Sequence, residues 1–120
     1  MEALTGRVVA GKRLGRRLGF PTANLRVEGV VPPRGVYAVV AVAAGRRYQA
    51  VMNIGEHPTA PGGGPTVEVH LLDFAGDLYG QEIAVEPVRW LREERRFDSL
   101  DALKAQLKED CALARAIVTL

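Results

Sequence analysis

Two runs rich in β-branched residues, Val36 to Ala43 and Arg47 to Ile54, are separated by the short segment Ala44-Gly45-Arg46. Such runs predict strands, and so short a connection makes them pair as an antiparallel hairpin. The preceding segment, Val30 to Gly35, contains Pro32 and Pro33 and cannot be helical. The chain is therefore expected to be built around an antiparallel sheet.

Further strands are predicted on both sides of this hairpin. Leu4 to Ala10 forms a short strand, Thr66 to Phe74 alternates between apolar and polar residues, and Ile83 to Trp90 contains Pro87. Proline inside a strand is confined to an edge or a bulge. The pattern predicts five or six strands, with one face of Thr66 to Phe74 buried.

An amphipathic helix is predicted near the C-terminus, where Asp98 or Ser99 can cap it. Its apolar residues recur at intervals of three and four. They are Leu100, Leu103, Leu107, Cys111, Ala114 and Ile117. We expect a mainly β, single-domain chain in which a small barrel spans about residues 1–97 and the helix, about residues 99–117, packs against it.

Composition narrows the class of protein. With 120 residues, 48% of them hydrophobic and 25% charged, the chain suits one soluble globular domain. No apolar run approaches the roughly 20 residues of a membrane helix, and the N-terminus lacks the features of a secretion signal. The single cysteine, Cys111, suits a reducing compartment. We expect a cytoplasmic protein with no membrane partner.

The most chemically distinctive segment is GKRLGRRLGFPTAN, residues 11–24. Gly11, Gly15 and Gly19 allow backbone amides to approach an anion, and basic residues such as Arg16 supply positive charge. The spacing matches neither a P-loop nor a dinucleotide-binding fingerprint. It suits both a polyphosphate cradle and an ordinary basic surface loop.

Three oxygen-bearing side chains are candidates for phosphoryl-transfer chemistry. Thr22 and Asn24 lie two positions apart, so an extended chain places both on one side, which suits Mg²⁺ when ATP brings negative charge. Glu68 lies in mid-strand, on the face opposite Val67 and Val69, where a carboxylate can act as general base. The alternative for Thr22 and Asn24 is a turn capped by its own side chains. The alternative for Glu68 is a glutamate that is merely solvated.

Arg92, Arg95 and Phe97 follow the last predicted strand. They suit a loop over a flat aromatic ligand, with the arginines near its phosphate and Phe97 or Trp90 near its ring. A solvated connection into the helix is the alternative. The two histidines, His57 and His70, lack the spacing of a zinc site.

A small basic barrel can also bind nucleic acid strands through aromatic platforms. The net charge of +2 is too small to indicate such a partner, although basic residues are concentrated before position 35. The aromatic residues show no clustering of the kind that strand binding requires. We therefore expect no nucleic acid partner.

Six segments together resemble the riboflavin kinase family, as found in the C-terminal module of bacterial bifunctional FAD synthetases and in stand-alone eukaryotic enzymes. They are GRRLGFPTANL at 15–25, PPRGVYAV at 32–39, NIGEHPT at 53–59, VEVHLLDF at 67–74, DLYGQ at 77–81 and LREERRFDSLDAL at 91–103. The resemblance spans nearly the whole chain.

The resemblance implies a six-stranded antiparallel Greek-key barrel with a C-terminal helix. It also implies transfer of the γ-phosphate of MgATP to the 5′-hydroxyl of riboflavin, giving FMN and ADP. Mg²⁺ or another divalent cation is the implied cofactor, and ATP the co-substrate. A non-catalytic barrel that binds flavin, nucleotide or nucleic acid is the alternative function.

Site roles follow from the resemblance residue by residue. Thr22 and Asn24 match metal and nucleotide ligands, and Glu68 matches the catalytic base. The remaining matches are Gly11 and Arg16 in the nucleotide-binding loop, Tyr79 on the nucleotide side, and Arg92, Arg95 and Phe97 in the mobile loop near the flavin. The family's adenylyltransferase module needs a separate domain, for which this chain has no room, so we expect any such N-terminal module in a longer protein.

Overall fold

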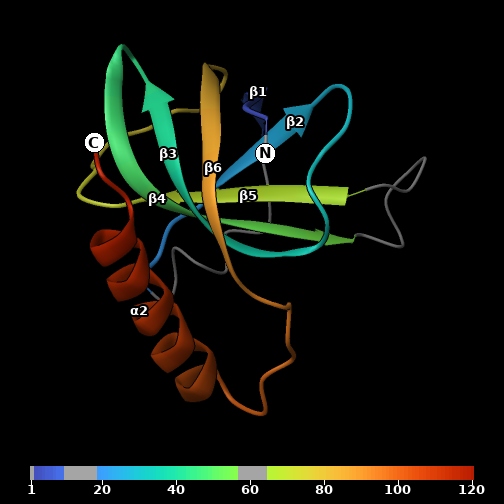
Figure 1. Ribbon diagram of the computed structural model, residues 1–120, viewed down its shortest axis with the longest axis vertical. Coiled ribbons are helices and arrows are strands. Elements are labelled where there is room, and N and C mark those ends of the chain that lie inside the picture. Colours follow the sequence, from blue (N-terminus) through green and yellow to red (C-terminus); the bar gives the residue numbers. More distant parts are fainter. Residues whose placement is uncertain (1, 10–18, 57–64) are drawn as a thin grey trace.

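The computed structural model of the chain describes residues 2–9, 19–56 and 65–120. Within these residues it forms six strands and one helix (Figure 1). They are β1 (Leu4–Val9), β2 (Ala23–Val27), β3 (Gly35–Ala43), β4 (Arg46–Glu56), β5 (Pro65–Leu71), β6 (Glu82–Arg92) and α2 (Leu100–Ile117).

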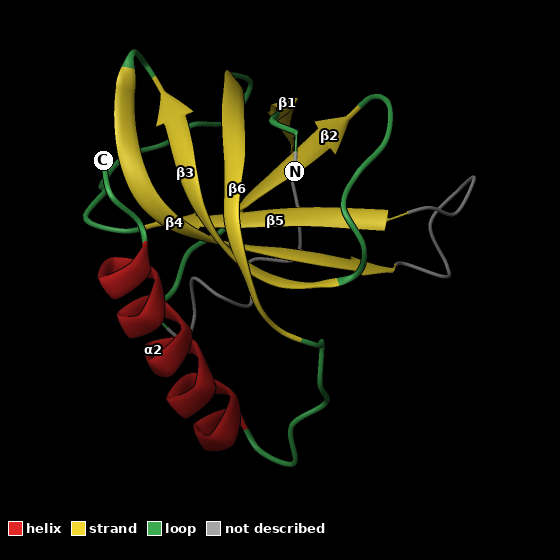
Figure 2. Ribbon diagram, viewed as in Figure 1, coloured by secondary structure: helices red, strands yellow, loops and turns green. Residues whose placement is uncertain are grey.

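The six strands close into an antiparallel barrel in the order β1-β2-β5-β4-β3-β6, and pairing of β1 with β6 completes it. β3, β4 and β5 are neighbours in succession, while β2 lies beside β5. This arrangement is a Greek key. The predicted barrel is confirmed, and Figure 2 shows the C-terminal helix lying along one side of it.

Alternating side chains fill the barrel. In β5, Val67, Val69 and Leu71 are buried, whereas Glu68 and His70 lie on the outer face and are half-buried. The inward residues of all six strands join in one apolar cluster. The predicted buried face of this strand is confirmed.

The hairpin between β3 and β4 is also confirmed. The strands pair from Gly35 opposite Ile54 to Ala43 opposite Arg46. Ala44 and Gly45 connect them with φ angles of 49° and 77°. A two-residue hairpin turn of this type requires positive φ at both positions, because its twist then matches that of the strands.

Two strands, β2 and β5, differ most from the sequence prediction. The sequence pattern predicts only an extended segment near Asn24, whereas Ala23–Val27 forms β2; five residues are too few for alternation to be distinctive. β5 ends at Leu71 and not at Phe74, because Asp73 has a φ of 57° that ends the extended backbone. Pro87 lies at a register shift between β6 and β3, as its position predicts.

The helix begins after Ser99, whose hydroxyl accepts a hydrogen bond from the Ala102 N–H at 3.0 Å. It packs on the outer side of the barrel, where Ala114 joins a second apolar cluster with residues of β3 and β4. Leu100 is 59% exposed, contrary to prediction, because the N-terminal end of α2 extends away from the barrel (Figure 1). No helix in the described ranges is long and apolar enough to cross a membrane.

Asp110 connects α2 to the end of β6. The residue is fully buried, and its carboxylate accepts hydrogen bonds from Arg92 Nε at 3.0 Å and Nη2 at 2.8 Å. Gln106 Nε2 donates a further bond at 3.0 Å. Charge-assisted, bidentate contacts of this kind have a defined geometry. Asp110 therefore determines where the helix lies relative to the last strand.

We predict that Asp110→Ala lowers the free energy of unfolding by about 3–5 kcal/mol, because it leaves the largely buried guanidinium of Arg92 without its counter-charge. Urea denaturation measures this loss. The control is Glu86→Ala, which removes the exposed ion pair to Arg47 and should cost about 0–1 kcal/mol. Equal losses in the two variants would contradict a special role for Asp110.

Candidate functional site

A row of polar residues crosses the outer face of the barrel. Glu68 of β5 lies directly opposite Asn24 of β2 and Asn53 of β4. Directly opposed residues of antiparallel strands point to the same face. Glu68 therefore lies between two amide-bearing residues, and all three residues are half-buried.

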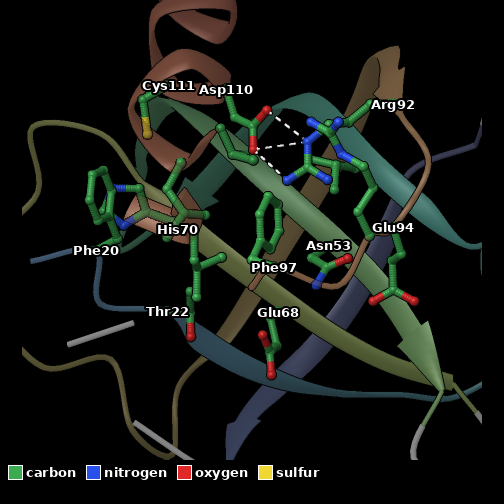
Figure 3. Close-up of a pocket in the computed structure, with 15 residues that line it drawn as sticks. Phe20, Thr22, Asn53, Glu68, His70, Arg92, Glu94, Phe97, Asp110 and Cys111 are labelled. Atoms are coloured by element: carbon green, nitrogen blue, oxygen red, sulfur yellow. Dashed lines mark hydrogen bonds and ion pairs between the residues drawn. The ribbon is translucent and has the colours of Figure 1, made fainter. Parts of the chain in front are cut away.

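A cleft of about 300 Å³ lies between this face, α2 and the loop after β6 (Figure 3). Glu68 and Asn53 belong to its polar part, and Val51, Leu103 and Leu107 to its apolar part. The other lining residues are Phe20, Thr22, Val36, His70, Arg92, Glu94, Arg95, Phe97, Asp110 and Cys111. An apolar cleft with a few convergent polar groups is typical of small-molecule sites.

A second cleft, of about 360 Å³, is formed partly by the segment before β2 and partly by the turn after β5. At its rim Tyr79 is 65% exposed, and its backbone N–H donates to Asp77 Oδ1 at 2.8 Å. Thr22 lines both clefts. The two clefts therefore adjoin at this residue.

The loop after β6 forms one side of the first cleft. The guanidinium carbons of Arg92 and Arg95 lie 5.8 and 5.6 Å from the centre of the Phe97 ring, which are cation–π distances. Arg95 also donates to Gln106 of α2. These contacts hold Phe97 at the cleft, where it lies between Asn53 and the helix in Figure 3.

Glu94 holds the same loop against the barrel. Its carboxylate pairs with Arg34 at 3.2 Å. A Cβ at Gly55 would lie 2.6 Å from Glu94 Oε2, so a side chain at that position of β4 would require the Glu94 carboxylate to shift. The absence of a side chain at Gly55 leaves room for the Glu94 carboxylate beside β4.

Cys111 belongs to the helical wall of the first cleft. Burial, together with the neighbouring charge of Asp110, raises the pKa of its thiol to about 11. The thiol is therefore protonated at neutral pH, and a protonated thiol is a poor nucleophile. Cys111 therefore contributes apolar surface to the cleft.

Most site residues expected from the sequence lie at these two clefts. Glu68, Arg92, Arg95 and Phe97 line the first, Tyr79 lines the second, and Thr22 lines both. Asn24 lines neither and lies beside Glu68 in the strand register. Gly11, Gly15 and Arg16 lie outside the described residues. Trp90, the alternative to Phe97, is not among the residues that line either cleft.

Sequence reasoning missed several residues of the first cleft, chiefly Asn53, His70, Glu94 and Asp110. Asn53 falls in a predicted strand, but only the pairing with Glu68 makes it a site residue. His70 lacks the spacing of a zinc site, and the signal that could have found it is its place two residues from Glu68 on one face of the strand. No sequence signal indicates Asp110, because its partner Arg92 lies on another element.

The donor set fits a divalent cation. A threonine hydroxyl and an asparagine amide offer hard oxygen donors of the kind that Mg²⁺ accepts, and Thr22 and Asn24 supply them two positions apart, beside Glu68. In the part of the chain that the structure describes, no three His, Cys, Asp or Glu side chains are grouped to hold a metal. Mg²⁺ commonly takes its remaining ligands from phosphates and water.

Two solved structures with a similar fold illustrate the architecture. A Streptococcus pneumoniae protein described as a macrolide-efflux protein matches with a TM-score of 0.88 and 36% identity, over 94% of this chain and 38% of that one. Riboflavin kinase from Trypanosoma brucei matches with a TM-score of 0.63 and 26% identity, over 95% of this chain and 77% of that one.

Comparison of sequences gives the family. The chain is 50% identical over 115 residues to the bifunctional riboflavin kinase/FMN adenylyltransferase of Escherichia coli strain K12, a match that covers 94% of this chain and 37% of that protein. It thus spans little more than a third of that relative's length. The family model for riboflavin kinase, named Flavokinase, matches residues 2–118. The chain therefore belongs to the riboflavin kinase family.

Proposed function

We propose that this chain transfers the γ-phosphoryl group of MgATP to the 5′-hydroxyl of riboflavin and releases FMN and ADP. The observation that carries the proposal is that two clefts adjoin at Thr22, with Glu68 lining one of them. Such an arrangement lets one substrate enter each cleft and react at the junction. Membership of the family supports the same reaction, and we treat residues 1–120 as one catalytic domain.

The flavin is assigned to the first cleft. Leu103, Leu107 and Val51 offer apolar surface for the fused rings, and Phe97 offers an aromatic face. Its volume of about 300 Å³ is within the range of small-molecule sites. Glu68 and Asn53 line the same cleft, so a ribityl chain that extends from the rings towards Thr22 passes the carboxylate.

The nucleotide is assigned to the second cleft. The exposed ring of Tyr79 lies at its rim, and Thr22 is at the junction with the flavin cleft. Thr22 and Asn24 would hold the divalent cation, which when bound neutralises charge on the phosphates. On sequence grounds we assign Gly11, Gly15 and Arg16 to the phosphates as well.

Glu68 is the proposed base. A bond forms between the ribityl 5′-oxygen and the γ-phosphorus while the bond from that phosphorus to the bridging oxygen breaks. The hydroxyl proton passes to the Glu68 carboxylate, and the electron pair of the broken bond leaves with ADP. In a loose transition state the base contributes mainly by orienting the attacking hydroxyl. The cross-strand register supplies that orientation by placing Glu68 between Asn24 and Asn53.

The wider context of the reaction also belongs to this proposal. Because the bifunctional relative is much longer than this chain, we infer that the chain works beside an N-terminal adenylyltransferase module. The single cysteine suits a reducing compartment. We therefore assign the reaction to the cytoplasm.

The test of the proposal is the production of FMN from riboflavin and ATP by the purified chain, resolved by chromatography. We expect FMN in the presence of Mg²⁺ and none when EDTA is added. Binding of riboflavin without turnover would contradict the proposal and favour a non-catalytic barrel. FMN formation that EDTA does not affect would contradict the role of the cation.

We predict that Glu68→Gln lowers kcat by about 10² to 10⁴, the usual share of general-base assistance. The amide keeps the shape of the side chain but accepts no proton. Thermal denaturation should show little change, since the residue lies on the outer face of β5. Glu82→Gln, an exposed glutamate of β6, is the matched control. Near-normal turnover of Glu68→Gln would exclude the base role.

We predict that Asn24→Ala weakens binding of MgADP more than binding of riboflavin, because Asn24 is assigned to the cation. Asn53→Ala is the matched comparison from the other side of Glu68, and it should weaken riboflavin binding more. Calorimetry with each ligand separately measures both effects. Equal weakening of both ligands in each variant would contradict this division of roles.

A further inference from the structure

A hydrogen bond links His70 to the segment that precedes β2. Its Nδ1 lies 2.7 Å from the carbonyl oxygen of Pro21. Because a carbonyl oxygen accepts only, Nδ1 must carry the hydrogen. The contact therefore requires a hydrogen on Nδ1. When the ring is neutral, Nε2 then carries no hydrogen and can accept a hydrogen bond.

This bond lies where the backbone pairing of β2 with β5 ends. The register begins at Ala23 opposite Val69 and runs towards Asn24 opposite Glu68. Pro21 lies before that register and has no N–H to donate. The His70 side chain, and not the strand pairing, therefore attaches the Pro21 carbonyl to β5.

The attached segment contains the junction of the two clefts. Thr22 lies between the carbonyl held by His70 and Ala23, which is held by the sheet. The ring of Phe20 packs against that of His70 in an edge-on arrangement, with centroids 5.6 Å apart and an interplanar angle of 66°. Figure 3 shows both rings at the cleft, together with Thr22. Thr22 is thus held from both sides along the chain.

Glu68 and His70 lie two residues apart on the outer face of β5. β5 therefore carries the proposed base directly and attaches Thr22 through His70. We propose that His70 is a positioning residue that sets Thr22 relative to Glu68, and so controls binding of the metal–nucleotide rather than of the flavin. This inference rests on the proposed function and adds to it a role that the sequence did not indicate.

Three variants separate the possible roles of the ring. His70→Asn keeps an N–H donor at the position of Nδ1, His70→Gln moves the amide to the position of Nε2, and His70→Phe keeps a ring without a donor. We expect the Gln and Phe variants to lose about 10- to 100-fold in affinity for MgADP and in kcat/KM for MgATP, the usual cost of removing a group that orients a metal ligand. The affinity of His70→Asn for MgADP and its kcat/KM for MgATP should be closer to the wild-type values than to those of His70→Phe.

The readouts include measurements that do not depend on turnover. Calorimetry gives the affinity for MgADP, riboflavin fluorescence gives the flavin affinity, and thermal denaturation shows whether each variant is folded. In the wild-type protein, the ¹⁵N shifts of the imidazole should report a hydrogen on Nδ1. A hydrogen on Nε2 alone in the neutral ring would overturn the proposal even if a variant fails to fold.

Other outcomes overturn the proposal in distinct ways. Full activity of His70→Phe with loss in His70→Asn would assign the ring to flavin contact. Rescue by His70→Gln would assign the role to Nε2. Wild-type affinity for MgADP in all three variants would mean that His70 has no positioning role. Because wild-type FMN formation is measured in parallel, each result is distinguishable from failure of the proposed function.

Discussion

The register of β5 between β2 and β4 is the constraint on which the rest of the site depends. It directs Val67 and Val69 into the barrel and Glu68 and His70 outwards. A slip of one residue would exchange the two faces, exposing apolar surface at a cost of about 25 cal/mol per Å². Burial of the two valines therefore also fixes the place of the carboxylate, so stability and function rest on one pattern.

The barrel alone has an open polar face, and the C-terminal segment converts that face into a cleft. Arg92 leaves the barrel at the end of β6 and pairs with the buried Asp110. That pair directs α2 across the face and brings Phe97 to the cleft. Gly55 lets Glu94 approach β4 on the other side. The first cleft is thus a product of tertiary contacts between segments that are distant in sequence.

This origin explains what the sequence could and could not predict. Alternation in β5, the short hairpin connection and the helical spacing depend on neighbouring residues, so the architecture was predictable from the pattern. The grouping of Thr22 with Glu68 followed from the resemblance to a family. The structural role of Asp110 could not be predicted, because a carboxylate in the apolar face of a helix is explained only by its pairing with Arg92, which lies on another element. The role of Asn53 likewise depends on its pairing with Glu68, which the residues around Asn53 in the sequence do not indicate.

The central claim is that the two clefts hold the two substrates with the reacting atoms beside Glu68 and Thr22. A crystal structure of the chain with riboflavin, Mg²⁺ and a non-hydrolysable ATP analogue tests it most directly. The account predicts the ribityl 5′-hydroxyl about 2.6–3.2 Å from the Glu68 carboxylate, with the cation at Thr22. A flavin bound in the cleft of Tyr79, or a 5′-hydroxyl out of reach of Glu68, would contradict it.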